Sequence, residues 1–127
     1  MTLPIESLTT AALSLALDAA SQRHQLIAAN IANANAQGYT PLRLAFEEHL
    51  AEAQGALREQ GSVDAFALSS VRMTVEPAIG ADGQPAAVQL DVEVAEMARN
   101  AVHYQALTQG LSRHLSIMAM AAGDGKK

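Results

Sequence analysis

The chain has 127 residues, of which 50% are apolar but only 3% aromatic, with neither tryptophan nor cysteine, and its formal net charge is −5. The length allows one domain, and the absence of cysteine excludes disulfides and thiolate metal sites. The acidic balance argues against nucleic acid as a partner, because binding it needs a basic stripe. There is no run of about 18 or more apolar residues, so no membrane-spanning helix is expected.

The first predicted element, residues 1–33, is a long helix that begins after Pro4 and ends near Asn33. Two sets of mainly apolar positions along it follow heptad spacing and lie about 140° apart around the axis. A helix with two such faces is expected to pack against two partners. The first set is Leu8, Ala12, Leu15, Ala19, Gln22 and Leu26, and the second is Leu13, Leu17, Ala20, His24, Ile27 and Ile31.

This helix is expected to end in a short polar motif, Asn30-Ile31-Ala32-Asn33, which Gly38 and Tyr39 follow after a brief segment. Asparagine is a mediocre helix former whose side chain bonds to nearby backbone. A C-terminal cap with a permissive glycine beyond it explains Asn33 but not Asn30. We therefore expect Asn30 and Asn33 to bond to the backbone of the exiting segment or of a neighbouring subunit.

Residues 34–90 are predicted to form an irregular insert that carries a short helix and a β-hairpin. The helix is expected within residues 41–58, because Phe46, Leu50, Ala53 and Leu57 have helical spacing. Alternating side chains predict a strand at residues 71–76 and a return strand at residues 86–90. The glycines at residues 80 and 83 supply the turn between the two strands.

The last predicted element, residues 91–127, is a helix from near Asp91 to about Ala122 with a short tail. Asp91, Glu93 and Glu96 in its first turns suit the helix dipole. Heptad spacing over four repeats predicts a coiled-coil seam. We therefore expect a mainly α fold in which the long terminal helices pair as a coiled coil. The seam is Val94, Met97, Ala101, Tyr104, Thr108, Leu111, Leu115, Met118 and Ala122.

Patterns that carry chemistry are missing from the sequence. The four histidines, His24, His49, His103 and His114, contain no pair at i, i+4 spacing, as a helical zinc site would need. Neighbouring carboxylates at residues 47 and 48 splay by about 100° on a helix and suit a solvated face. No phosphate loop, nucleophile motif or dinucleotide fingerprint is present. We expect no enzymatic activity, metal, cofactor or small-molecule substrate.

The polar motif and the last helix together resemble the flagellar rod and hook axial proteins. Their N-terminal signature is an Asn-Ile-Ala-Asn helix end followed by Thr-Pro-Gly-Tyr, and here Ala36-Gln37 replace Thr-Pro. The start of the last helix is similar to the Val-Asp-Leu-Asp-x-Glu sequence of a small rod subunit. The resemblance covers roughly residues 8–46 and 88–120. Its C-terminal part consists of Val88, Leu90, Asp91, Glu93, Met97, Asn100, Tyr104, Gln105, Ala106, Leu107, Leu111 and Ser112.

The resemblance implies a structural subunit of the proximal rod in the bacterial flagellum basal body. Such subunits are secreted unfolded through the flagellar type III export apparatus, without a cleaved signal, and assemble helically in the periplasm. The implied partners are the protein itself, other rod proteins, and the MS-ring and export-gate components, including the rod-base adaptor. The assembly residues are expected to be Asn30, Ile31, Ala32, Asn33, Gly38, Tyr39, Leu90, Asp91, Glu93, Tyr104, Gln105, Leu107, Leu111 and Leu115.

Phe46 and Leu50 also resemble a Phe-x-x-x-hydrophobic element by which early substrates of this family engage the export gate. Simple packing of both side chains is the competing interpretation. For the whole chain, the alternatives are a non-polymerising helical adaptor or chaperone-like protein and, within the family, another rod subunit. A small hydrolase or metal enzyme is a third class, which nothing in the sequence selects. The isolated chain is expected to be a monomer with frayed ends whose helicity rises with concentration.

Overall fold

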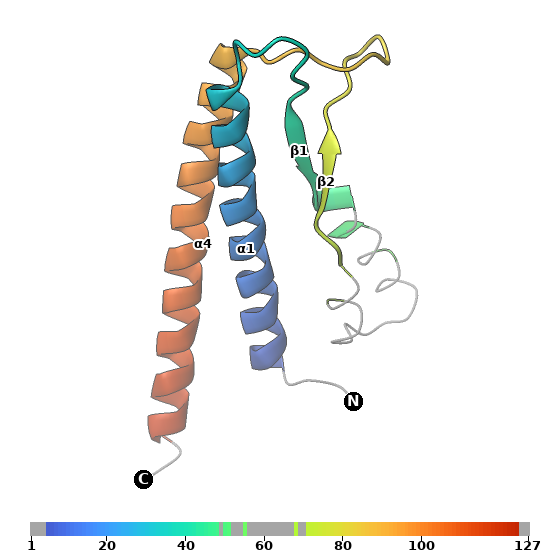
Figure 1. The fold of residues 1–127 in the computed structure, drawn as a ribbon. Helices are drawn as coiled ribbons and strands as arrows, with labels where there is room; N and C mark the ends of the chain where they lie inside the picture. Colours follow the sequence, from blue (N-terminus) through green and yellow to red (C-terminus); the bar gives the residue numbers. More distant parts are fainter. Residues whose placement is uncertain (1–4, 49, 52–54, 56–67, 69–70, 125–127) are drawn as a thin grey trace.

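The computed structural model describes residues 5–48, 50–51, 55, 68 and 71–124, and it is mainly helical (Figure 1). Helix α1 spans Ile5–Ala32 and helix α4 spans Leu90–Asp124. Two short strands, β1 (Leu42–Ala45) and β2 (Thr74–Pro77), form a small antiparallel sheet. The inner ends of the two helices lie within one residue of their predicted positions, and α4 continues two residues beyond its predicted end.

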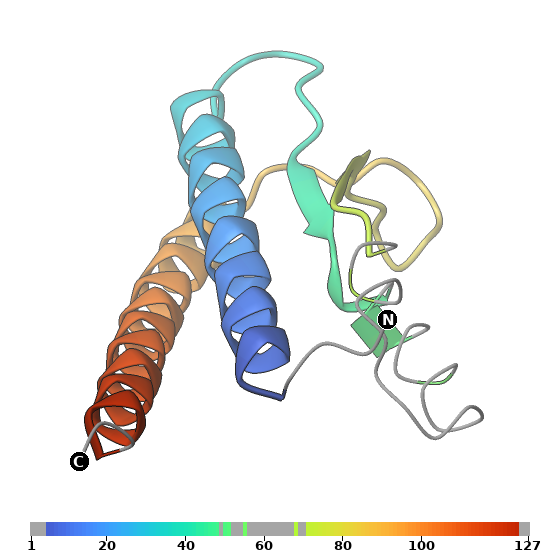
Figure 2. The ribbon, with the colours of Figure 1, turned by 90° about the horizontal axis from the view of Figure 1, so that it is seen from below.

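The two helices pack side by side and run in opposite directions, and the sheet lies on the other side of α1 (Figures 1 and 2). Helix α1 is therefore the middle layer, which agrees with the expectation that it has two partners. The side facing the sheet uses the first heptad set, whereas Ala20 of the second set is buried where α1 meets α4. Small side chains allow this close approach between helices.

The apolar core lies between α1 and the sheet rather than between the helices. Its buried members are Ala19, Leu44, Phe46 and Val71, and Leu15, Leu26, Leu50 and Met73 pack against them half-buried. By contrast, α4 contributes Asn100 as its one buried residue among those that the structure describes. The buried apolar cluster therefore joins α1 to the sheet, where burial stabilises the fold by about 25 cal/mol per Å².

The predicted pairing of the hairpin is wrong. Strand β2 pairs with β1, in the register Leu42↔Pro77 to Ala45↔Thr74, and not with residues 86–90. The predicted turn is present, with Gly83 at φ +78° and the Gly83 N–H donating to the Gly80 carbonyl over 3.0 Å. The return beyond it is limited to an isolated bridge between Ile79 and Pro85. Pairing with β1 prevails because it buries Leu44 and its neighbours against α1.

The predicted short helix begins later than expected, because residues 42–45 form strand β1. Helical geometry starts at Glu47, and the Leu50 N–H donates to the Phe46 carbonyl over 2.9 Å. Phe46 is itself buried in the core rather than on a helix face. Ala53 and Leu57, which the prediction used, lie outside the described residues.

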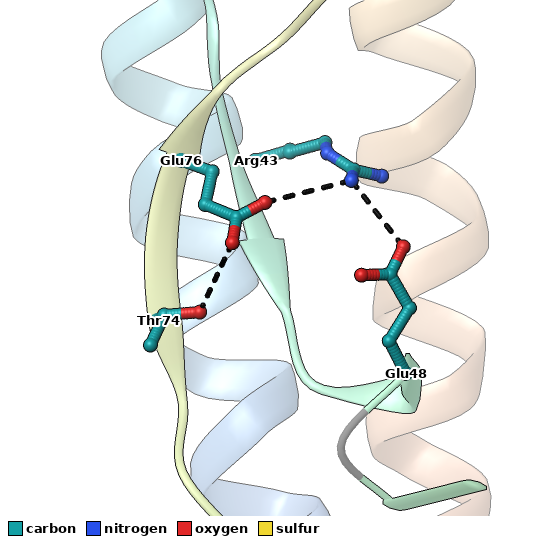
Figure 3. Close-up of polar contacts among 4 residues, drawn as sticks. All are labelled: Arg43, Glu48, Thr74 and Glu76. Atoms are coloured by element: carbon teal, nitrogen blue, oxygen red, sulfur yellow. Dashed lines mark hydrogen bonds and ion pairs between the residues drawn. The ribbon is translucent and has the colours of Figure 1, made fainter. Parts of the chain in front are cut away.

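The solvent face of the sheet carries a small polar network centred on Arg43 (Figure 3). Its guanidinium lies 3.3 Å from a Glu48 carboxylate oxygen and 3.6 Å from one of Glu76, which stands directly opposite on β2. The Thr74 hydroxyl donates to Glu76 over 3.5 Å. These side chains are largely exposed, so each ion pair is worth less than about 1 kcal/mol. The network favours the β1–β2 register without dominating its stability.

The predicted seam of α4 only partly coincides with the face that meets α1. Met97, Leu111 and Met118 of that seam are half-buried, but Val94, Ala101, Tyr104, Thr108 and Leu115 are exposed. The inward face instead includes Glu93, Asn100, Leu107 and His114. Each of these stands one position before an expected seam residue, namely Val94, Ala101, Thr108 or Leu115. One position is a rotation of about 100° around a helix, so that half of the predicted seam lies on the flank of α4, while Met97, Leu111 and Met118 lie on the α1 side.

Candidate functional site

The side-chain amide of Asn30 makes four hydrogen bonds. Asn30 is 2% exposed. Its Nδ2 donates to the Leu42 carbonyl over 2.9 Å and to Glu93 Oε2 over 3.2 Å. Its Oδ1 accepts from the Leu42 N–H over 2.9 Å and from the Tyr39 hydroxyl over 3.0 Å. An amide has two donors and two acceptor sites, so its capacity is fully used.

Asn30 bonds to the backbone of Leu42 as a neighbouring strand would, because it donates to the Leu42 carbonyl and accepts from the Leu42 N–H. In and just before β1, the backbone hydrogen-bonding groups of residues 41, 43 and 45 point towards β2. The bond from the Ala78 N–H to the Pro41 carbonyl (2.8 Å) indicates this direction. The N–H and carbonyl of Leu42 therefore point the other way, towards α1, where Asn30 receives both. Asn30 thus provides hydrogen-bond partners for the N–H and carbonyl of Leu42, at the edge of β1 that faces away from β2. The predicted bond between Asn30 and the exiting backbone is present.

The chain reaches this position through a compact series of turns after α1. The Ala36 N–H donates to the Asn33 carbonyl over 3.0 Å, and the Tyr39 N–H donates to the Ala36 carbonyl over 3.3 Å. Gly38 between them has a φ of +74°, in the left-handed region that disfavours residues with a Cβ atom. The turns direct the Tyr39 hydroxyl back to Asn30.

Asn33 has a different role from the one predicted jointly with Asn30. Its Nδ2 donates over 2.8 Å to the Ala29 carbonyl, which also accepts from the Asn33 N–H. This bond lies within the last turn of α1 and satisfies a carbonyl at the helix end. The side chain therefore stabilises the helix terminus, whereas Asn30 joins α1 to two other elements.

Glu93 extends the joint to the second helix. Because its carboxylate accepts from Asn30, the first turn of α4 is tied to the last turns of α1. We call the group formed by Asn30, Tyr39, Leu42 and Glu93 the asparagine joint. It brings together three of the sequence-predicted assembly residues, namely Asn30, Tyr39 and Glu93, and adds Leu42, which the prediction did not include.

A second buried asparagine was missed as a contact residue. Asn100, on α4, is 6% exposed, and its Nδ2 donates to the backbone carbonyl of Ala20 on α1 over 2.8 Å. The sequence signal was present, because a polar residue stood between Met97 and Ala101 of an apolar face. Its partner is a backbone atom 80 positions away, which no local pattern specifies. This contact fixes the register of the two helices at the point where Ala20 permits close approach.

The remaining predicted assembly residues do not gather into one site. Leu107 and Leu111 are half-buried on the side of α4 that meets α1, and Ile31 is half-buried near the end of α1. Ala32, Gly38, Leu90, Asp91, Gln105 and, at roughly half exposure, Tyr104 and Leu115 face solvent. The candidate export residues are inward: Phe46 is 6% exposed and Leu50 is half-buried in the same core.

Two hollows flank the helix pair. One, of about 500 Å³, lies between α1, β1 and α4 beside the asparagine joint, and its walls carry the Arg23–Glu47 and Arg99–Glu96 ion pairs. The other, of about 450 Å³, lies between α1 and α4 alone. We call it the α1/α4 groove, and it is lined by Ala20, Ser21, His24, Asn100, Ala101, Val102, Tyr104 and Gln105.

The two hollows differ in their side chains: charged groups such as Glu93 and Arg99 line the first, whereas small and amide side chains predominate in the second. Within the part of the chain that the structure describes, no three histidine or acidic side chains gather as they would to hold a metal ion. His24 and His103 are exposed on different helices, and His49 lies outside the described residues. Glu47 and Glu48 are used in separate ion pairs, with Arg23 and Arg43 respectively.

The comparisons with known proteins add no relative. No protein-family model matches the chain, and no curated protein matches it either. Neither described helix is long and apolar enough to cross a membrane. The fold and site therefore define a two-helix protein with a small sheet and a polar joint, and any narrower assignment depends on the arrangement of that joint.

Proposed function

We propose that the chain is a structural subunit of the bacterial flagellar basal-body rod, of the type of the proximal-rod subunit FlgB. The observation that carries the proposal is the asparagine joint. The Asn-Ile-Ala-Asn helix end and the following Gly-Tyr, which are the residues of the resemblance, work together in one bonded group around Asn30. Their contacts give the end of α1 and the path of the exiting chain a defined geometry, which a repeating subunit requires.

The distribution of apolar surface also supports a packing role. Val94, Val102, Leu115, Ile117 and Met120 of α4 are each about half exposed or more, although they occupy a long regular helix. Monomeric proteins seldom leave so many large apolar side chains along one element in water, and such surfaces usually contact another chain. In the proposed rod, neighbouring subunits cover these side chains, so the terminal helices complete a coiled-coil-like packing only in the assembly.

The proposed setting follows from the same assignment. The subunit is exported unfolded by the flagellar type III apparatus without a cleaved signal and folds in the periplasm. There it joins copies of itself and other rod proteins to the MS-ring and export-gate components, including the rod-base adaptor. The protein acts by geometry and needs no cofactor, metal or substrate.

The test is deletion of the coding sequence in the source bacterium, followed by imaging of basal bodies in intact cells. The proposal predicts non-motile cells whose basal bodies lack density at the proximal end of the rod, and restoration by the wild-type gene. Normal motility and complete rods after deletion would refute it. Loss of density at a distal rod position would instead identify another rod subunit.

A non-polymerising helical adaptor is separated from a rod subunit by limited proteolysis combined with sedimentation of the purified chain. A rod subunit should lose its termini first and self-associate when intact. An adaptor should remain a compact monomer at every concentration.

A further inference from the structure

The outer side of α4 carries a surface that none of the described residues covers. Ile117, Met120 and Arg113 lie about 100° to 160° around the helix from Asn100, which faces α1. Ile117 is 56% exposed and Met120 is 63% exposed. We call these three residues the outer stripe. It is built from large apolar side chains and one basic residue.

The α1/α4 groove has the opposite character. Three small side chains, Ala20, Ser21 and Ala101, line it together with His24, Asn100, Val102, Tyr104 and Gln105. Asp18 is exposed on α1 one turn before Ser21, so it stands at the rim of the groove. The groove thus offers space and an acidic rim, whereas the outer stripe offers bulk and a basic side chain.

Resting on the proposed rod function, we infer that the outer stripe of one subunit docks in the α1/α4 groove of a second copy. Spacing along the helices supports this pairing. Arg113 precedes Ile117 by four residues, about 6 Å along α4, and Asp18 precedes Ser21 by three residues, about 4.5 Å along α1. A helix that runs parallel to α1 with Ile117 in the groove therefore brings Arg113 to Asp18.

The contact is heterologous, because the outer stripe and the groove are different surfaces of the same subunit. Docking one into the other leaves a free stripe at one end and a free groove at the other, so association continues instead of closing as a dimer. The inferred charge pair chiefly fixes which register is used, since complementary charges at an interface suppress wrong arrangements.

The experiment uses sedimentation velocity on the full chain with charge reversals on each surface. Asp18→Arg alone and Arg113→Asp alone should each raise the concentration for half-association about tenfold, because like charges then meet. The double variant Asp18→Arg/Arg113→Asp should associate like wild type. An equal mixture of the two single variants should do the same, because every contact between unlike copies restores an opposite-charge pair.

Matched controls separate the inferred contact from general effects of charge and apolar surface. Arg72→Asp changes the charge equally at an exposed arginine away from both surfaces, and it should leave association unchanged. Ile117→Asp should abolish association, whereas Val75→Asp, at a similarly exposed valine on β2, should not. All five positions are exposed, so far-ultraviolet circular dichroism should report wild-type helicity in every dilute variant.

Two results would overturn the inference, and they have different consequences for the proposed function. If wild type self-associates and the two single reversals associate equally well, the contact lies elsewhere while the proposed function survives. If wild type stays monomeric at every concentration and temperature used, both the inferred contact and a self-assembling rod subunit are contradicted.

Discussion

Asn30 and Leu42 exchange two hydrogen bonds of 2.9 Å each, so a helical side chain occupies the position of a neighbouring strand. The polar end of α1 is thus joined to the sheet rather than merely capped. The same amide also receives Tyr39 and reaches Glu93, so replacing it should affect the helix exit, β1 and the start of α4 together.

Replacing Asn30 with alanine should lower the free energy of unfolding by about 3 kcal/mol, since the N–H and carbonyl of Leu42 both lose their partner near the core. Asn33→Ala removes one bond inside the last helical turn and should cost about 1 kcal/mol or less. Urea unfolding of the two variants measures this difference. Equal losses would mean that Asn30 is an ordinary helix-end residue.

In assembly, the double variant Asn30→Ala/Asn33→Ala should be impaired while its helicity changes little, because the helical backbone bonds remain. Sedimentation and circular dichroism on the same sample test this. Normal assembly of the double variant would contradict a role of the joint in positioning neighbouring subunits.

Asn100 should show a sharp dependence on the chemistry of its replacement. Asn100→Leu removes the hydrogen bond to the Ala20 carbonyl, but that carbonyl remains part of the α1 helix. The free energy of unfolding should therefore fall by only about 1 kcal/mol. Asn100→Asp places a carboxylate against that same carbonyl in a buried position and should cost about 3 kcal/mol or more. Thermal unfolding at neutral pH compares them. If the Asn100→Asp variant were as stable as the Asn100→Leu variant, this site would have to be open to water.

Gly38 and Gly110 make a matched pair for backbone conformation. An added Cβ meets nothing within 4 Å at either position, but only Gly38 has a positive φ, at +74°. Gly38→Ala should therefore destabilise the protein by about 1 kcal/mol. Gly110→Ala, inside α4, should stabilise it by up to about 1 kcal/mol through helix propensity. Opposite shifts in the unfolding midpoint are the expected result, and shifts of the same sign would refute this account.

The two long helices could be predicted from the sequence because their signals are local and repeated over many turns. The Asn30 bond to the exiting chain was also accessible, since its partner Leu42 is only 12 positions away. The β1–β2 pairing was not, because Leu42-Arg43-Leu44-Ala45 is too short to distinguish strand from helix. Its partner strand lies about 30 residues further along the chain, and the choice is made by burial of Leu44 against α1. The contact of Asn100 could not be predicted for the same reason, because its acceptor, the Ala20 carbonyl, is determined by the tertiary register of the two helices.

The buried position of Phe46 allows packing to be separated from a role in export. Phe46 and Leu44 are each 6% exposed in one core cluster, so Phe46→Ala and Leu44→Ala should both lose about 3 kcal/mol of stability. Because the subunit is proposed to be exported unfolded, we expect secretion through the flagellar apparatus, measured in culture supernatants, to be equal for the two variants. A selective loss with Phe46→Ala would show that the side chain is recognised before folding, since the folded core conceals it.

The far half of α4 should be the least protected part of the helix pair in a dilute solution. After Asn100, the described α4 side chains that turn towards α1 are only half-buried, at Leu107, Leu111, His114 and Met118. A helix with so little tertiary burial is marginal in water. Hydrogen exchange should therefore show protection centred on Ala20 and Asn100 and rapid exchange near residue 120. Protection of that end should rise with protein concentration as neighbouring copies cover it. Uniform protection of α4 that is independent of concentration would mean that the α1–α4 contact alone suffices to order the helix.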